Sequence, residues 1–106
     1  MTEFKPELVH DNERYKIEDT DLKSFTMSRT ILHPNQSTRG HSHPWPEIYV
    51  CTDGEGTLIL NSPDEKFTIK KGDLHKISSI RFHKVETVDG IEFYCFFRGT
   101  RENYPI

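Results

Sequence analysis

The sequence predicts an all-β protein whose antiparallel strands form a small barrel or sandwich, with little helix. Short segments rich in β-branched and aromatic residues recur along the 106 residues, and polar turn signals such as Asp-Gly separate them. Strands spaced about 8 to 12 residues apart with intervening turn signals are typical of barrels and sandwiches. No long segment shows the apolar period of about 3.6 residues that marks a helix. A chain of this length is expected to form one domain with a modest core.

Each predicted strand ends where residues that favour turns begin. In chain order the predicted strands and the turns that close them are Phe25 to Leu32 before His-Pro-Asn, Glu47 to Thr52 before Asp-Gly, Thr57 to Leu60 before Asn-Ser-Pro-Asp, Lys66 to Ile69 before a Lys-Gly-Asp turn, Leu74 to Ile77, His83 to Val88 before Asp-Gly, and Ile91 to Arg98. Residues 1–21 are polar with isolated apolar positions, so they predict an N-terminal arm with one short edge strand. The barrel domain is expected over residues 22–106.

The composition limits the partners of this chain. Hydrophobic residues make up 33% and charged residues 29%, which is poor in apolar surface for a self-sufficient globule, so we expect a homodimer to bury part of that surface. The net charge of -3 comes without a basic stripe, which argues against nucleic acid and anionic membranes as partners. The N-terminus lacks the apolar run of a signal peptide, so a cytoplasmic location is expected.

Two cysteines, Cys51 and Cys95, lie within apolar segments that are predicted to be strands. They are expected to be buried thiols. The alternative is a disulfide between them, which requires the two strands to be neighbours and which a reducing compartment disfavours.

A metal-binding pattern lies in the run His-Ser-His-Pro-Trp-Pro-Glu. His41 and His43 are two residues apart and would project from the same face of a strand, while Glu47 follows after a Pro-containing turn. Another imidazole, His83, lies downstream. Three nitrogens and one oxygen suit one divalent transition metal ion, Fe, Mn, Ni, Co or Zn, with positions left for water or substrate. The alternative for the two neighbouring histidines is a surface pair on a turn.

These residues resemble the first motif of the cupin superfamily, in which an H-x-H pair, a glutamate and a glycine follow an opening glycine at fixed spacing. His41, His43, Glu47 and Gly54 occupy those H, H, E and G positions. Asn35 stands in place of the opening glycine. Because asparagine tolerates a left-handed backbone better than most residues, the turn is expected to survive this change.

The second cupin motif is matched less completely. Gly72 and His83 occupy its glycine and histidine positions, whereas Ser78, Ile80 and Thr87 replace its proline, glycine and asparagine. These departures bear on the turn before His83 and not on the ligand itself. The two motifs span about half of the chain, residues 35–87. The resemblance implies a small, single-domain cupin, an antiparallel jelly-roll barrel that holds a metal ion at His41, His43, Glu47 and His83.

Within the superfamily, the run from Gly40 to Val50 resembles cupins that act on sugars, such as the archaeal-type phosphoglucose isomerases and the small cupin that opens uronate rings in pectin degradation. This implies a metal-dependent enzyme that isomerises, epimerises or opens the ring of a compact polar substrate, a sugar or sugar acid. Cupins also include Fe(II)-dependent dioxygenases and proteins that only bind or sense a small molecule, and these two functions remain as alternatives.

Four residues near the ligands are candidates for substrate binding or catalysis. Arg39 lies two residues before His41, so in a regular strand it would share the ligands' face and anchor a carboxylate or phosphate; the alternative is a solvated charge. Trp45 could stack on a sugar or cover a dimer interface. Glu47 is a possible proton shuttle as well as a ligand. Tyr49 is a candidate proton-transfer group by position, although packing alone would also explain it.

Overall fold

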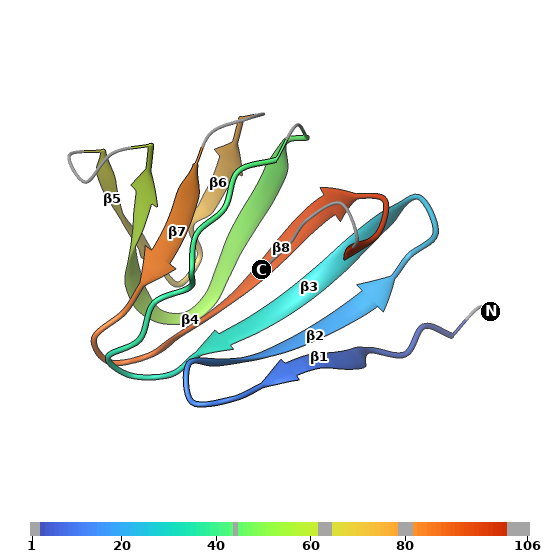
Figure 1. Ribbon diagram of the computed structural model, residues 1–106, viewed down its shortest axis with the longest axis horizontal. Helices are drawn as coiled ribbons and strands as arrows, with labels where there is room; N and C mark the ends of the chain where they lie inside the picture. The colour runs from blue at the N-terminus through green and yellow to red at the C-terminus, as the bar shows by residue number, and fades with distance from the viewer. Residues whose placement is uncertain (1–2, 44, 62–64, 79–81, 102–106) are drawn as a thin grey trace.

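The computed structural model describes residues 3–43, 45–61, 65–78 and 82–101 (Figure 1). Within these ranges the chain forms strands and no α-helix, which confirms the predicted all-β fold. The strands are β1 Glu7–Asp11, β2 Tyr15–Asp21, β3 Phe25–Leu32, β4 Glu47–Leu60, β5 Lys66–Lys70, β6 Leu74–Ile77, β7 His83–Glu86 and β8 Ile91–Arg98. None of the described segments forms a helix that could cross a lipid bilayer.

All described strand pairs are antiparallel and give the order β1-β2-β3-β8-β4-β5, with β6 and β7 also paired to β4. The first half of β4 pairs with β6 and β8, and its second half pairs with β5 and β7. Through this bent strand the sheet folds back on itself and forms two walls (Figure 1). The architecture is the small antiparallel jelly roll that the resemblance to cupins implies.

One turn expected from the sequence is absent. The Asp-Gly pair after Thr52 does not separate two strands; β4 runs on through it for 14 residues. The pairing with β8 shifts between Cys51 and Asp53, and Gly54 has a φ of 77°. A side chain at Gly54 would collide with the carbonyl oxygen of Gly90. Glycine therefore permits both the left-handed backbone and the close approach of two chain segments, and the result is a bend instead of a turn.

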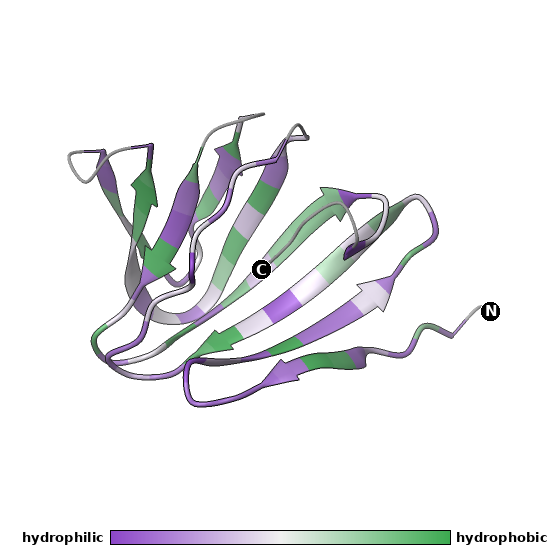
Figure 2. Ribbon diagram, viewed as in Figure 1, coloured by the Kyte–Doolittle hydropathy of each residue, from purple (hydrophilic) through white to green (hydrophobic). Residues whose placement is uncertain are grey.

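Every second side chain along the strands points inward, and these side chains fill the interior. On β8, Ile91, Phe93, Cys95 and Phe97 are buried, and β8 is largely hydrophobic along its length in Figure 2. Both cysteines are buried free thiols, as predicted. Cys51 pairs with Phe93, so Cys51 and Cys95 lie diagonally on the inner face of β4 and β8.

The N-terminal segment contributes more than the expected arm with one edge strand. It holds two strands, of which β1 is an edge and β2 pairs along its whole length with β3. Tyr15 and Ile17 of β2 belong to the hydrophobic core, each with 3% of its surface exposed. The charged residues around Tyr15 and Ile17 lower the average hydropathy of the segment, so the segment was not predicted to contribute to the core. The two apolar positions nevertheless have the spacing of two residues that is typical of one face of a strand.

Candidate metal centre

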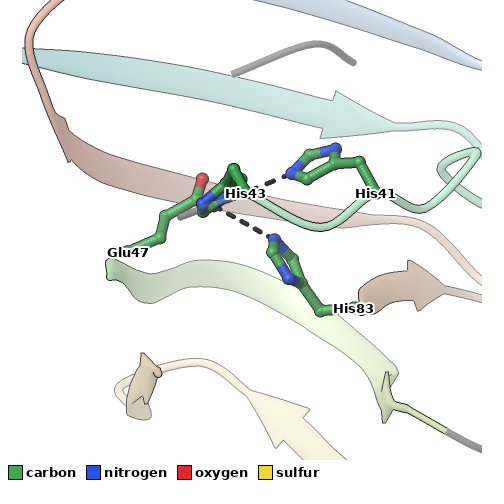
Figure 3. Close-up of side chains that lie close together, drawn as sticks. All are labelled: His41, His43, Glu47 and His83. Atoms are coloured by element: carbon green, nitrogen blue, oxygen red, sulfur yellow. Dashed lines mark hydrogen bonds and ion pairs between the residues drawn. The ribbon is translucent and has the colours of Figure 1, made fainter. Parts of the chain in front are cut away.

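The four residues of the metal-binding pattern meet at one end of the barrel. His41 and His83 form an isolated antiparallel pair, in which the backbone N–H of His41 donates to His83 O at 3.1 Å and that of His83 donates to His41 O at 3.0 Å. His83 begins β7, Glu47 begins β4, and His43 lies in the irregular segment between. Figure 3 shows the three imidazoles gathered around the carboxylate.

The ligand atoms of this cluster lie within 4.8 Å of one another. Oε2 of Glu47 is 2.8 Å from His43 Nε2, 3.1 Å from His83 Nε2 and 3.8 Å from His41 Nε2. Atoms bound to one metal ion at about 2.0–2.2 Å are themselves roughly 3 to 4 Å apart. The cluster could therefore hold an ion with only small side-chain movements.

Burial supports the same conclusion. The side chains of His43, Glu47 and His83 are buried, and that of His41 is 19% exposed. Within the described residues, Nε2 of His41 is buried and has no hydrogen-bond partner, since Glu47 lies beyond hydrogen-bonding reach. Leaving a buried nitrogen unsatisfied costs about 1–3 kcal/mol, and a metal ion would remove that cost.

A backbone contact sets the tautomer of His43. Its Nδ1 lies 2.6 Å from the carbonyl oxygen of Trp45, and because a carbonyl can only accept, Nδ1 carries the proton. The lone pair of Nε2 in the neutral ring then points toward the Glu47 carboxylate at 2.8 Å. Two acceptors this close need a cation between them, which is either a proton or a metal ion.

The electrostatics of the cluster favour the protonation states that metal ligands require. Burial alone would raise the pKa of Glu47, but the interactions with His41, His43 and His83 hold that pKa well below its usual range. Burial lowers the pKa of His41, and the nearby Glu47 offsets this only in part. At neutral pH the site therefore offers a carboxylate and a neutral imidazole.

A cavity of about 30 Å³ adjoins the cluster, which is room for about one water molecule. Its lining combines hydroxyl, aromatic, thiol and charged groups: Ile17, Ser28, Thr30, Thr38, His41, Glu47, Tyr49, Phe93, Cys95 and Arg101. The hydroxyl groups come from β3 and from the segment before His41, and the aromatic and thiol groups come from β4 and β8.

Tyr49 points inward, as its spacing from Glu47 predicts. It is 5% exposed, stacks on Phe93 with ring centroids 5.3 Å apart, and meets the His83 ring edge-on at 5.8 Å. Burial, followed by the negative charge of Glu47, raises the pKa of Tyr49 well above 10. The phenol stays protonated at neutral pH and can donate a hydrogen bond into the cavity, but it is a poor base.

Arg39 does not take the inward position that regular strand geometry would give it. The segment around it pairs with β7 only through isolated bridges at Ser37 and His41, so the period of two does not hold there. Arg39 is exposed, and Thr38 lines the cavity instead. Thr38 is held by its hydroxyl, which accepts the backbone N–H of Val85 at 3.0 Å.

Trp45 also lies away from the cavity. The residue is 42% exposed, and the guanidinium carbon of Arg98 lies 5.9 Å from the centroid of its ring. The direct contribution of this residue to the cluster is the carbonyl oxygen that orients His43.

Sequence reasoning missed a cation that does line the cavity, Arg101. Its Nε and Nη2 donate to the two carboxylate oxygens of Asp19 at 2.8 and 2.7 Å, and Nη2 also donates to Ser28 Oγ at 2.6 Å. The guanidinium packs 4.8 Å from the centroid of Phe97. No local signal marks Arg101, because it follows the last strand in a polar segment. Cys95 could have been placed at the site from its alternation with Phe93 and Phe97.

The structure shows how Asn35 and Thr87, two residues that depart from the cupin motifs, are accommodated. Asn35 has a φ of 60°, which confirms that asparagine supports the left-handed turn in place of glycine. Thr87 is buried; its hydroxyl donates to Glu55 O at 2.7 Å and accepts the N–H of Gly90 at 3.0 Å. Ile80 lies outside the described residues, so the expected change in the turn before His83 stays a prediction.

The bent jelly roll and its cluster of three histidines and one glutamate define a class of small β-barrel proteins with a possible metal site. A family model described as the cupin domain matches residues 28–97. This chain belongs to the cupin superfamily.

Several proteins resemble this chain. An uncharacterized protein of Methanocaldococcus jannaschii is 29% identical over 87 residues, which is 80% of this chain and 62% of that protein, so the chain spans under two thirds of this relative. An RmlC-like cupin of Shewanella frigidimarina superposes with a TM-score of 0.80 at 13% identity, covering 95% of this chain and 90% of that one. An oxalate decarboxylase of Lactobacillus farciminis, in complex with formate, has a TM-score of 0.76 at 18% identity, covering 91% of this chain and 31% of that one. The structural matches concern the fold alone.

Proposed function

We propose that this protein is a small cupin enzyme that holds one divalent transition metal ion at His41, His43, Glu47 and His83 and acts on a compact polar substrate. The observation that carries the proposal is the convergence of three imidazole nitrogens on one carboxylate oxygen, with His41 Nε2 buried and lacking a hydrogen-bond partner among the described residues. This donor set suits Fe, Mn, Ni, Co or Zn. A bound ion would supply a Lewis acid with open positions for substrate oxygens.

The reaction we propose is isomerisation, epimerisation or ring opening of a sugar or sugar acid, in which a proton moves next to a carbonyl or hydroxyl group. The Glu47 carboxylate is the candidate proton carrier at the cluster because of its position, 2.8 to 3.8 Å from the Nε2 atoms of all three imidazoles. The Tyr49 phenol would donate a hydrogen bond to a substrate oxygen. The hydroxyls of Ser28, Thr30 and Thr38 offer further partners to a polar ligand.

The cavity size favours a second candidate, an Fe(II)-dependent dioxygenase. About 30 Å³ accommodates a diatomic molecule without rearrangement, whereas a sugar would require cavity side chains to move. A third possibility is a binding or sensor protein, which would hold the metal and a ligand without turnover.

Three measurements distinguish these functions. Elemental analysis of protein purified without chelator identifies the metal and its stoichiometry. A panel of sugars, sugar acids, sugar phosphates and small carboxylates, followed by NMR, reports isomerised or ring-opened products. Oxygen uptake after anaerobic loading with Fe(II) reports the dioxygenase. Stoichiometric metal with ligand binding but no conversion would favour the binding protein, and the absence of metal affinity would refute the proposal.

Metal affinity should fall as the pH falls, because protons compete for the histidine nitrogens. Burial lowers the pKa of His41 below its ordinary value of 6.5, so this imidazole stays neutral, and able to bind, to a pH below 6.5. The low pKa of Glu47 keeps its carboxylate available over the same range. Calorimetric titration with Zn²⁺ between pH 8 and pH 5 checks this, and affinity that stays constant to pH 5 would contradict a mainly histidine site.

Arg101 replaces Arg39 as the candidate anchor for an anionic substrate, because it lines the cavity while Arg39 is exposed. Arg101→Met should weaken the binding of a small carboxylate to the metal-loaded protein by roughly 1.5 to 3 kcal/mol, the usual contribution of a hydrogen bond to a charged group. Calorimetry with glycolate measures this, and Arg39→Ala should have no effect. Asp19→Asn is the matched control, since it breaks the same ion pair but keeps the guanidinium. Equal losses in Asp19→Asn and Arg101→Met would assign Arg101 a structural role.

A further inference from the structure

A polar hollow of about 390 Å³ lies at the other end of β7 from the metal cluster. β7 begins at the cluster with His83 and ends at this hollow with Glu86. The turn between β1 and β2 and the segment after β3 complete its wall, and these three parts of the chain come together at the lower left of Figure 1. Among the described residues, the hollow and the cavity beside the cluster share no lining side chain. Its volume is within the range of small-molecule sites.

Hydrogen bonds hold the wall of the hollow in place. The side-chain oxygen of Asn12 accepts the backbone N–H of Arg14 at 2.9 Å and so fixes the turn that carries this arginine. Nη1 of Arg14 donates to Ser37 O at 3.2 Å, and Ser37 forms an isolated antiparallel bridge with Glu86. The three lining segments are therefore tied to one another before any ligand is present, which reduces the cost of ordering the site on binding.

The side chains that line the hollow retain unused hydrogen-bonding capacity. The Arg14 guanidinium donates to Ser37 O alone among the described residues, which leaves most of its N–H groups available. Within the same ranges, the Gln36 amide and the Glu86 carboxylate have no hydrogen-bond or ion-pair partner. Arg14, Gln36 and Glu86 are all partly buried. The hollow thus presents one cation, one anion and an amide, and the two charges do not neutralise each other by direct contact.

We propose that this hollow is a second binding site, which takes a small zwitterion such as a free α-amino acid. The ligand carboxylate binds the Arg14 guanidinium, whose planar fork suits a carboxylate, and the ligand ammonium group binds Glu86. An anion alone would meet the charge of Glu86, and a cation alone would meet that of Arg14, so only a ligand with both charges satisfies both residues. The exposed side chain of Val88 offers contact to the carbon skeleton. The inference is independent of the proposed metal chemistry.

NMR titration of the ¹⁵N-labelled full chain with each proteinogenic L-α-amino acid tests the site. At least one amino acid should shift the backbone amide signals of Ser37 and Glu86. Arg14→Met and Glu86→Gln should each weaken its binding at least about tenfold, because each removes a charge-assisted hydrogen bond. The matched control is Arg39→Met, which removes an exposed arginine of the same segment outside the hollow and should keep the parent's affinity. Circular dichroism and melting temperature verify that the variants fold.

Ligand analogues test the two charges without changing the protein. The N-acetyl derivative of the bound amino acid lacks the ammonium group, and its amide lacks the carboxylate, so each should bind the parent at least about tenfold more weakly. Glu86→Gln should not weaken the N-acetyl derivative further, and Arg14→Met should not weaken the amide further.

Four outcomes would overturn the proposal. The first is the absence of any shift with the amino acids at about 10 mM, which is weaker than the usual range of specific sites. The second is a set of shifts confined to the residues around the metal cluster, and the third is an N-acetyl derivative that binds as tightly as the free amino acid. The fourth is glucose shifting Ser37 and Glu86 where the amino acids do not, which would assign the hollow to a neutral sugar.

Discussion

His41→Ala should lower the affinity for a divalent transition metal by more than about a hundredfold, while the metal-free protein keeps its stability to within about 1 kcal/mol. Loss of a residue that only orients a ligand already weakens metal sites roughly 10- to 100-fold, and loss of a ligand costs more. In the metal-free protein Nε2 of His41 makes no hydrogen bond within the described residues, so alanine removes no bond there. Competition with a chelating dye measures the affinity, and urea unfolding measures the stability.

The controls separate ligation from folding. His10→Ala removes an exposed histidine far from the cluster and should retain the parent's affinity. His83→Ala should lose metal as well, but it also removes a fully buried ring and is expected to destabilise the fold. Stoichiometric metal retained by His41→Ala and His83→Ala would end the assignment of these ligands.

Gly54→Ala should destabilise the protein by about 3 kcal/mol, the largest effect expected from adding a single methyl group. A left-handed backbone with a Cβ atom costs about 1–2 kcal/mol, and a clash with packed atoms adds about 1–3 kcal/mol. At Gly54, φ is 77° and the added carbon would meet the carbonyl oxygen of Gly90, which belongs to the backbone and cannot rotate away. Urea unfolding followed by circular dichroism measures the difference.

Gly72→Ala is the matched control for the clash. Gly72 also has a positive φ, 94°, but an added Cβ atom would meet nothing within 4 Å. Its substitution should cost only the backbone strain, about 1–2 kcal/mol. Equal losses in the two variants would show that the approach of Gly54 to Gly90 is not what demands a glycine in β4.

The strands beyond Phe25 were predictable because each carries its own signal, a period of two bounded by turn residues. Two features escaped this reasoning. The Asp-Gly pair in β4 has the local chemistry of a turn, but its pairing partners β5, β7 and β8 extend the strand through it. The inward positions Tyr15 and Ile17 lie in a charged segment, and only pairing with β3 shows that β2 is internal. In both cases long-range hydrogen bonds outweighed local composition.

The candidate ligands were predictable from residue type and spacing, even though His41 and His43 do not lie in a regular strand as that reasoning assumed. What unites them is the backbone pairing of His41 with His83, a contact between segments far apart in the sequence. The prediction for Arg39 depended entirely on regular strand geometry. The structure therefore contradicts the inward position predicted for Arg39, whereas it brings the four candidate ligands together.

By itself the sequence determined which chemistry is available: three imidazoles and a carboxylate at cupin spacing, buried thiols on apolar strands, and a left-handed turn at Asn35. These properties follow from side-chain chemistry and from local backbone preference. Only the tertiary structure decided which cation lines the cavity, how little space the cavity leaves, and which polar side chains meet in the hollow at the end of β7. Arg101 reaches the cavity because its guanidinium binds Asp19, 82 positions earlier in the chain. No local pattern records such a contact, because it exists only after β2, β3 and β8 have paired.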